Sequence, residues 1–279
     1  MNHVSRRGFL LGAGLVAGGA AAVGIGVNEG VLPGRSWVYR ELGHDGPDGA
    51  VPRTTPGRTV SGGFVSEARL GLRCGWTIAF PPVESRDLPV AVVLHGRGND
   101  HASVFSPRYL ALDRFLASAV RQGAAPFALA SVDGGETYWH PRDSGEDAGA
   151  MVTDEFLPLL AGHGLDVSRL GFLGWSMGGY GALRLAGMLG PGRVAGVAAE
   201  SPALWHRYED TAPVAFDNAD DFAEATVFGR QVSLDGIPVR IDCGEGDPFY
   251  AATHDYVAGF DVPPAGGFQP GDHDVGYWR

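Results

Sequence analysis

The chain has 279 residues, 44% of them hydrophobic, which is enough to form one domain with a sizeable core. Its formal net charge is −11 and its pI is near 5.2. This acidic balance argues against a nucleic-acid partner or a surface that binds anionic membranes, because either would need clustered lysine and arginine.

The first 30 residues predict an export signal rather than part of the fold. Ser5-Arg6-Arg7-Gly8-Phe9-Leu10 resembles the twin-arginine export motif, and an uncharged run rich in Gly and Ala follows it as far as Val27. A membrane anchor is the alternative, although the run is barely long enough to span a bilayer. We therefore expect an exported protein, extracellular or associated with the cell envelope, with any membrane attachment confined to residues 1–30.

Residues 31–60 predict a linker or an extended arm, because they are rich in Gly, Pro and Arg and show no apolar periodicity. The catalytic domain is then expected to span residues 61–279. Residues 62–73 and 74–80 have the pattern of two strands, which would pair in an antiparallel arrangement and open a sheet.

Buried strands and helices alternate through the rest of the chain. Short apolar runs typical of strands buried on both faces lie at residues 90–94, 127–132, 170–173, 194–199 and 237–242. Helical patterns lie at residues 109–120, 148–160, 180–186 and 249–260, although Pro158 should kink or stop the second of them. This alternation predicts an α/β fold with a doubly wound, mostly parallel sheet and helices on both faces. Residues 203–235 lack a clear period and are expected to form an insertion with a short helix over the carboxyl edge of the sheet.

The chain has two cysteines, Cys74 and Cys243. Cys74 falls in an early strand and Cys243 in a late one, and such strands lie far apart in a doubly wound sheet. Because a disulfide requires Cα atoms within about 7 Å, we expect two buried free thiols.

The segment around Ser176 has the pattern of a nucleophile elbow. Gly174-Trp175-Ser176-Met177-Gly178 matches G-x-S-x-G, with a strand pattern before it and a helix pattern after it. The glycines leave room for the sharp turn that exposes the serine hydroxyl. Ser176 is therefore the candidate nucleophile.

Ligands of a doubly wound sheet bind beyond the carboxyl ends of its strands, where several polar residues of this chain are expected to converge. Asp242, Glu245 and Asp247 are the candidate acids near the last predicted strand. Asp242 falls inside the strand and Glu245 in the turn, whereas Asp247 follows in the loop from which a carboxylate can reach a histidine. We favour Asp247, which could also cap the next helix.

The candidate base must follow the acid if the order is Ser, acid, His. His254 and His273 both do so. His254 lies in a helical pattern that faces solvent, while His273 lies in a polar loop near the end of the chain and can fold back over the serine. We favour His273. The backbone N–H groups of Met177 and Arg97 are the candidate oxyanion donors, since each follows a strand end at the required place.

Four segments of the chain together have the spacing of a known group. They are Leu94-His95-Gly96, Asp133-Gly134-Gly135 with Tyr138-Trp139, Gly174-Trp175-Ser176-Met177-Gly178-Gly179-Tyr180-Gly181, and the late Asp247 and His273. Over roughly residues 60–279 they resemble the esterase D / antigen 85 group of α/β-hydrolases. The resemblance implies that the Asp133–Trp139 segment lies beside the acyl or alcohol pocket.

We therefore place five residues at the substrate: His95, Asp133, Tyr138, Trp139 and Trp175. Of these, His95 is expected to hold loop backbone with its ring rather than to take a direct part in catalysis. The side chain of Arg97 is a further candidate substrate contact.

The residues and the resemblance together predict an exported serine carboxylic ester hydrolase that works through a Ser-His-Asp triad and an acyl-enzyme on a small-molecule or lipid ester. We expect no cofactor and no catalytic metal, because the remaining histidines show no metal-ligand spacing. An acyltransferase that passes the acyl group to a sugar or glycerol hydroxyl, as mycolyltransferases do, uses the same triad and stays as the alternative. A non-catalytic binding protein on a hydrolase fold is the third reading.

Overall fold

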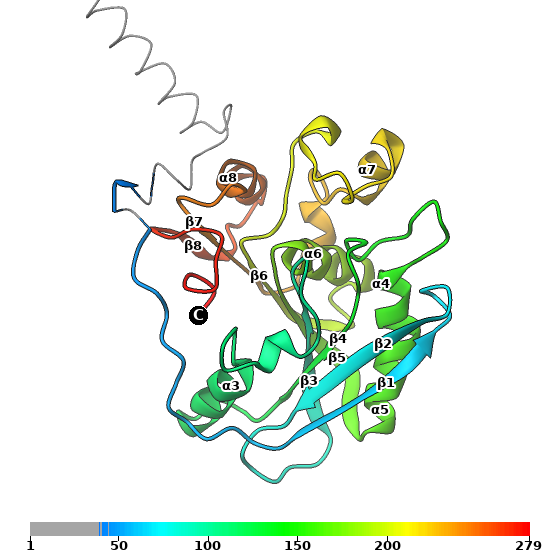
Figure 1. Ribbon diagram of the computed structural model, residues 1–279, viewed down its shortest axis with the longest axis vertical. Helices are drawn as coiled ribbons and strands as arrows, with labels where there is room; N and C mark the ends of the chain where they lie inside the picture. The colour runs from blue at the N-terminus through cyan, green and yellow to red at the C-terminus, as the bar shows by residue number, and fades with distance from the viewer. Residues whose placement is uncertain (1–38, 40, 44) are drawn as a thin grey trace, which may run out of the picture.

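A computed structural model describes residues 39, 41–43 and 45–279 of the chain. The predicted signal or anchor segment, residues 1–30, lies outside the described residues. Within the described part, no helix has the length and apolar character needed to cross a membrane. Residues 45–58 contain no helix or strand, and the extended blue trace of Figure 1 leads along the domain into the first strand. The Gly49 N–H donates to the Gly276 carbonyl at 2.7 Å, so this segment lies against the end of the chain.

An eight-stranded sheet forms the centre of the molecule, in the order β1-β2-β4-β3-β5-β6-β7-β8. Its strands are β1 Thr59–Ser66, β2 Leu72–Ala79, β3 Leu88–Leu94, β4 Ala128–Val132, β5 Leu165–Trp175, β6 Val194–Glu200, β7 Val239–Gly244 and β8 Ala265–Gln269. β1 and β2 pair in an antiparallel arrangement, β2 pairs antiparallel to β4, and all later pairs are parallel. The predicted doubly wound, mostly parallel sheet is confirmed. The strand order reverses between β3 and β5, which places the usual ligand crevice at their carboxyl ends.

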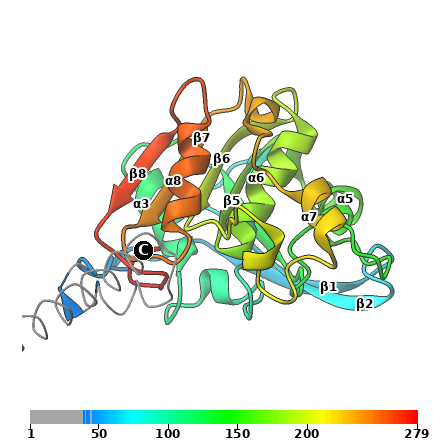
Figure 2. The same ribbon diagram turned by 90° about the horizontal axis from the view of Figure 1, so that it is seen from above.

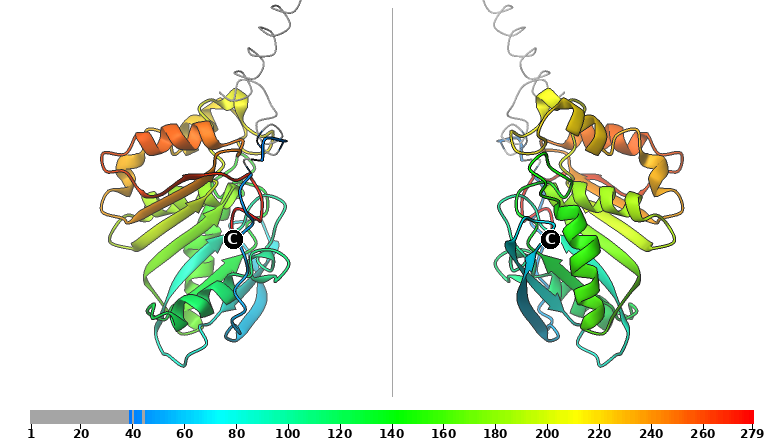
Figure 3. Two further views of the ribbon diagram at one scale, coloured as in Figure 1. Left: turned by 90° about the vertical axis from the view of Figure 1, so that its left-hand side faces the viewer. Right: turned by 90° about the vertical axis from the view of Figure 1, so that its right-hand side faces the viewer.

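Helices cover both faces of the sheet. The α-helices are α3 Leu112–Arg121, α4 Ala148–Ala150, α5 Leu157–Gly162, α6 Met177–Leu189, α7 Ala219–Ala225 and α8 Tyr250–Ala258. Short 3₁₀ turns occur at Ser103–Phe105, Tyr208–Asp210 and Gln231–Leu234. Figures 2 and 3 show α6 and α8 on the same side of the strands. The core of that side includes residues of α5, α6 and α8, whereas α3 packs with a second cluster on the opposite face.

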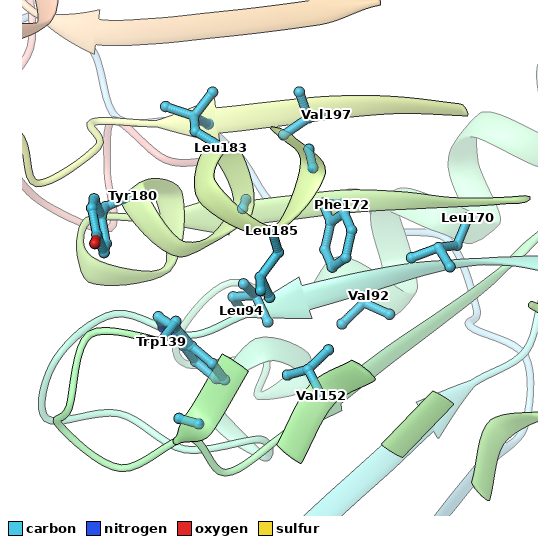
Figure 4. Packing of buried hydrophobic residues seen from close by; sticks show 14 of the residues in the cluster. Val92, Leu94, Trp139, Val152, Leu170, Phe172, Tyr180, Leu183, Leu185 and Val197 are labelled. Carbon is cyan, nitrogen blue, oxygen red and sulfur yellow. The ribbon is translucent and has the colours of Figure 1, made fainter. Parts of the chain in front are cut away.

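The larger core lies between the central strands and α6 (Figure 4). Val92 and Leu94 of β3 and Phe172 of β5 face Leu185 of α6, and all four side chains are almost completely buried. The apolar runs seen in the sequence thus form the middle of the sheet, which makes a rigid base for the loops at the carboxyl edge.

Two details of the fold differ from the sequence-based expectation. The helix that contains Pro158 does not stop there but continues to Gly162, because Pro158 lies in the first turn of α5, where a missing N–H costs least. The turns before it, Met151–Phe156, are π-helical. Strand β8 was not predicted, since Ala265-Gly-Gly-Phe-Gln is short and glycine-rich and pairs with β7 through backbone alone.

Cys74 and Cys243 are both buried and are not joined in a disulfide, as predicted. They belong to β2 and β7, which are separated in the sheet by β4, β3, β5 and β6. The expected insertion is also present between β6 and β7. It contains α7, whose amino end is capped by the Asn218 side chain.

Candidate active site

Ser176 occupies a strained turn between β5 and α6. Its backbone angles are φ 54° and ψ −122°, a conformation that residues with a Cβ rarely adopt. The Ser176 N–H donates to the Glu200 carbonyl at 3.0 Å, and the Ser176 carbonyl accepts from the Ala203 N–H at 2.9 Å. The glycines on either side are sterically required: a Cβ on Gly174 would collide with the Gly178 carbonyl, and one on Gly178 with the Leu94 carbonyl. The turn predicted from the motif therefore exists.

Ser176, His273 and Asp247 form a continuous hydrogen-bonded chain. The Ser176 Oγ lies 2.9 Å from His273 Nε2, and His273 Nδ1 donates to Asp247 Oδ2 at 2.7 Å. Asp247 is completely buried, and its second oxygen accepts from the Phe249 N–H at 2.7 Å. That bond holds the carboxylate in the loop before α8. The N-cap of α8 is Phe249, which has no side-chain cap, so the suggested capping of this helix by Asp247 is not seen.

The other candidate acids and base lie elsewhere. Asp242 is paired with Arg240 on the same strand, with atoms 2.6 Å and 2.9 Å apart. His254 is exposed on α8 and lies 3.5 Å from Asp255. The carboxylate bonded to His273 is that of Asp247 and not that of Glu245.

Strand β8 and the end of the chain hold His273 in place. The loop after β8 is tied to the loop after β7, since the Gly246 N–H donates to the Gly271 carbonyl at 2.8 Å. The His273 ring packs edge-on against Phe249 and Trp278, with centroids 5.2 Å and 4.9 Å away. The base thus depends on a strand that the sequence did not reveal.

The backbone N–H groups of Met177 and Arg97 have no acceptor among the described residues. Met177 is the first residue of α6, where N–H groups have no acceptor within the helix and the helix dipole favours negative charge. Arg97 follows β3 and lines the same cleft as Ser176. Both N–H groups stay candidate oxyanion donors.

His95 is a buried structural residue and does not line the cleft. Its Nε2 accepts from the Gly134 N–H at 3.0 Å, and its Nδ1 donates to the Gly96 carbonyl at 2.9 Å. Burial lowers the pKa of His95, which keeps the ring neutral and its Nε2 lone pair available. The prediction that the His95 ring binds loop backbone is confirmed. The prediction that His95 lies at the substrate is corrected, because His95 is not among the residues that line the cleft.

Three further residues placed at the substrate also lie outside the cleft. The two carboxylate oxygens of Asp133 accept from the Gly75 N–H at 3.0 Å and the His101 N–H at 2.8 Å. Trp139 is completely buried in the core, and Trp175 is almost so, on the α3 side of the sheet. A motif places such residues at a strand end, but which way each side chain points depends on the backbone of the loop.

Tyr138 is the one of these five residues that lines the cleft. Tyr138 and Trp139 both have left-handed backbone angles, φ 55° and φ 58°, a strained pair for residues with large side chains. This turn sends Trp139 into the core and leaves Tyr138 on the wall beside Ser176.

The cleft at Ser176 is open and has a volume of about 540 Å³. Tyr138, Trp205 and Phe249 form an aromatic wall, with neighbouring ring centroids 5.7 Å and 5.3 Å apart. At the rim Arg97 pairs with Glu136 at 3.3 Å, both side chains being about half exposed. A larger hollow of about 830 Å³ lies at the other end of β7 and β8, away from Ser176.

Sequence reasoning left Trp205 open between pocket lining and ordinary loop packing, and it missed Phe249 and Glu136 as cleft residues. Trp205 and Phe249 come from the insertion and from the segment before α8, and no spacing in the sequence relates them to each other. Among the described residues, no group of three or more His, Cys, Asp or Glu side chains has the arrangement of a metal site.

The fold and this constellation at the carboxyl edge define an α/β-hydrolase. A solved ferulic acid esterase superposes with a TM-score of 0.62 at 20% identity, covering 80% of this chain and 94% of that one. A fluorophosphonate-binding serine hydrolase of Staphylococcus aureus gives 0.62 at 19% identity, covering 80% and 94%. An S-formylglutathione hydrolase from Agrobacterium tumefaciens gives 0.58 at 19% identity, covering 84% and 93%.

A family model described as "Putative esterase" matches residues 68–279, so the chain belongs to this esterase family. No curated protein sequence matches the chain. The protein is thus an esterase with the α/β-hydrolase fold.

Proposed function

We propose that Ser176, His273 and Asp247 are the catalytic triad of an exported carboxylic ester hydrolase, placed in the esterase D / antigen 85 group. The observation that supports this best is the chain of two hydrogen bonds, 2.9 Å and 2.7 Å long, that joins the serine hydroxyl to a buried carboxylate through one imidazole. Such a chain is what a serine nucleophile needs in order to lose its proton near neutral pH.

In the proposed mechanism Ser176 Oγ attacks the ester carbonyl carbon while His273 Nε2 takes its proton. The Met177 and Arg97 N–H groups stabilise the negative oxygen of the tetrahedral intermediate. His273 then returns the proton to the leaving alcohol as the carbon–oxygen bond breaks, which leaves an acyl-enzyme. Water attacks this ester by the same steps and releases the acid. Asp247 holds the His273 tautomer and stabilises the imidazolium in both halves of the cycle.

The shape of the cleft supports compact acyl groups as substrates. It is open to solvent and walled by aromatic rings, and it has the volume of a small-molecule site. Acyl transfer to a sugar or glycerol requires that the acceptor hydroxyl compete with water, and an open cleft admits water freely. Hydrolysis is therefore the first proposal and acyl transfer the alternative outcome.

Replacement of Ser176 by alanine tests the proposal. We expect the wild-type protein to release a burst of p-nitrophenol from p-nitrophenyl butyrate and to be labelled by a fluorophosphonate probe, because both require a reactive serine. Ser176→Ala should lower kcat about 10⁴-fold or more and abolish labelling. Full activity in Ser176→Ala would reject the assignment. Transesterified product in the presence of glycerol or trehalose would favour the acyltransferase.

Export is tested separately through the two arginines of the predicted signal. Cell fractionation should place the wild-type protein outside the cytoplasm, and replacing Arg6 and Arg7 by lysine should retain it inside. Identical fractions for both would reject twin-arginine export without affecting the proposed chemistry.

A further inference from the structure

The wall of the cleft is built from two segments that are distant in sequence. The loop after β4, residues 133–147, carries Tyr138. The insertion between β6 and β7 carries Trp205 and Ala212 in its first part, residues 201–226. Tyr138 and Trp205 face each other with their ring centroids 5.7 Å apart. Neither residue lies in a helix or a strand, so no regular ladder of hydrogen bonds sets their distance. Other contacts must hold the insertion, the yellow segment of Figure 1, against the loop.

Arg142 makes the strongest of these contacts. Its Nε and one terminal nitrogen donate to the two carboxylate oxygens of Asp217 at 3.1 Å and 2.6 Å, and its other terminal nitrogen donates to the Val214 carbonyl at 2.9 Å. The Asp143 N–H also donates to Asp217, at 2.7 Å. The Arg142 side chain is only 8% exposed. The Asp217 side chain is 26% exposed, and the two-pronged geometry of the pair makes it directional.

His140 forms a second link close to the first. Its Nε2 donates to the Ala215 carbonyl at 2.9 Å, and its Nδ1 lies 3.3 Å from the Asp221 carboxylate. The His140 ring stacks on Phe216 with a centroid distance of 5.0 Å, and Phe216 in turn contacts the Tyr138 ring. The insertion is thus bonded to the loop on both sides of an aromatic ring that supports the cleft wall.

The loop itself is fixed to the body of the domain. Arg69 donates to the Glu146 carboxylate at 2.8 Å and to the Asp133 carbonyl at 2.9 Å, one at each end of the loop. Trp139 is buried in the core. The loop is therefore held in place by the domain, and the hydrogen bonds of Arg142 hold the insertion against the loop.

We propose that Arg142 is a positioning residue for the substrate cleft. By holding Asp217 and Val214, it keeps Trp205 at the distance from Tyr138 that a bound acyl group needs. The proposal rests on the function proposed above. Arg142 touches neither the reacting atoms nor the triad, so its loss should weaken binding of acyl groups that fill the cleft and leave the chemical step intact. Because its pair with Arg142 lowers the pKa of Asp217 to about 2, the link should persist across the pH range of an esterase assay.

Kinetics of the full-length protein with two acyl groups test the proposal. In Arg142→Gln and Asp217→Asn we expect KM for p-nitrophenyl benzoate to rise about tenfold with kcat within about twofold of wild type, the pattern of lost uniform binding. KM for p-nitrophenyl acetate should change by less than about twofold, because an acetyl group is too small to span the wall. In Arg142→Lys, KM for p-nitrophenyl benzoate should lie between the values of wild type and Arg142→Gln, since an ammonium keeps the charge but cannot bond both carboxylate oxygens as a guanidinium does. The matched control is Arg207→Gln, which breaks the exposed Arg207–Asp210 pair of the same insertion. This variant should leave KM and kcat unchanged for both esters.

Amide hydrogen exchange gives a readout that does not depend on activity. Residues 212–226 should exchange faster in Arg142→Gln and Asp217→Asn than in wild type or Arg207→Gln. This difference would persist even if Ser176 proved not to be the nucleophile, so the two proposals can fail separately. Unchanged exchange and unchanged benzoate KM would overturn the role of Arg142, as would an equal fall in kcat for both esters. If Arg142→Gln does not fold, Asp217→Asn and Arg142→Lys provide the same comparison.

Discussion

Glu200 shows at the scale of a single residue how the catalytic turn is supported. Its carbonyl accepts the Ser176 N–H, and its side chain stands at the end of β6, in register with Asp242 of β7. Burial and the nearby Asp242 charge raise the pKa of Glu200 to about 7. The backbone of this residue is thus needed at the elbow, while its carboxyl group is in an environment that disfavours its charge.

Replacing Glu200 by glutamine should therefore stabilise the protein in mild alkali. Between its ordinary pKa of 4.5 and the folded value near 7, the folded protein keeps a proton that the unfolded chain has released. Stability from this group is complete below pH 4.5 and is lost as the pH rises through 7, by up to about 3 kcal/mol. Urea unfolding at pH 8 should show Glu200→Gln to be more stable than wild type by 1–3 kcal/mol or so, with little difference at pH 4.5. Equal stabilities at pH 8 would contradict the assigned environment.

At the site, hydrogen bonds between loops join neighbouring strands beyond the ends of their backbone pairing. His95 connects the end of β3 to the end of β4 by accepting the Gly134 N–H, and so supports the turn that presents the Arg97 N–H. This link requires a neutral ring, because a protonated Nε2 has no lone pair to accept with.

Acid should consequently weaken the protein through His95. Because the folded pKa lies below the ordinary value of 6.5, the stability contributed by the neutral ring is present above pH 6.5 and is lost as the pH falls toward the folded pKa. The loss can reach about 1.4 kcal/mol per pH unit for one proton. Urea unfolding at pH 7.5 and 5.0 should show a smaller acid loss in His95→Gln than in wild type. His254→Gln, at an exposed position, should keep the wild-type loss, and equal losses in all three proteins would refute the assignment.

For the whole molecule, the sheet explains why this chain can carry two cysteines without a disulfide. Cys74 and Cys243 are fully buried in strands separated by four others. The stability of the domain therefore comes from its core, and oxidation is not required for folding.

A reductant should then leave the unfolding midpoint unchanged. Thermal unfolding with and without dithiothreitol should give the same Tm within about 1 °C, because removing a disulfide would cost 2–5 kcal/mol or so. Titration with a thiol reagent in denaturant should find two free thiols per chain. A fall in Tm with reductant, or fewer than two thiols, would show a covalent link.

Local patterns in the sequence were sufficient for all strands of the sheet except β8 and for the residues of the proposed triad. The apolar runs and the glycine-flanked Ser176 act over a few residues, and the need for an acid and a base after the serine left few candidates, of which Asp247 and His273 are hydrogen-bonded. Strand β8 escaped detection because Ala265–Gln269 is short and glycine-rich and therefore has no apolar pattern.

Only the tertiary structure decided which side chains face the substrate. His95, Asp133 and Trp175 stand at strand ends, and Trp139 lies in the loop after β4. All four lie outside the cleft, and Trp205 and Phe249 form its wall together with Tyr138. The direction of a side chain in a loop depends on contacts with segments far along the chain, such as the bonds from Arg142 to the insertion. A sequence motif indicates which chemistry a residue can take part in, whereas contacts between distant segments determine the shape of the cleft around Ser176.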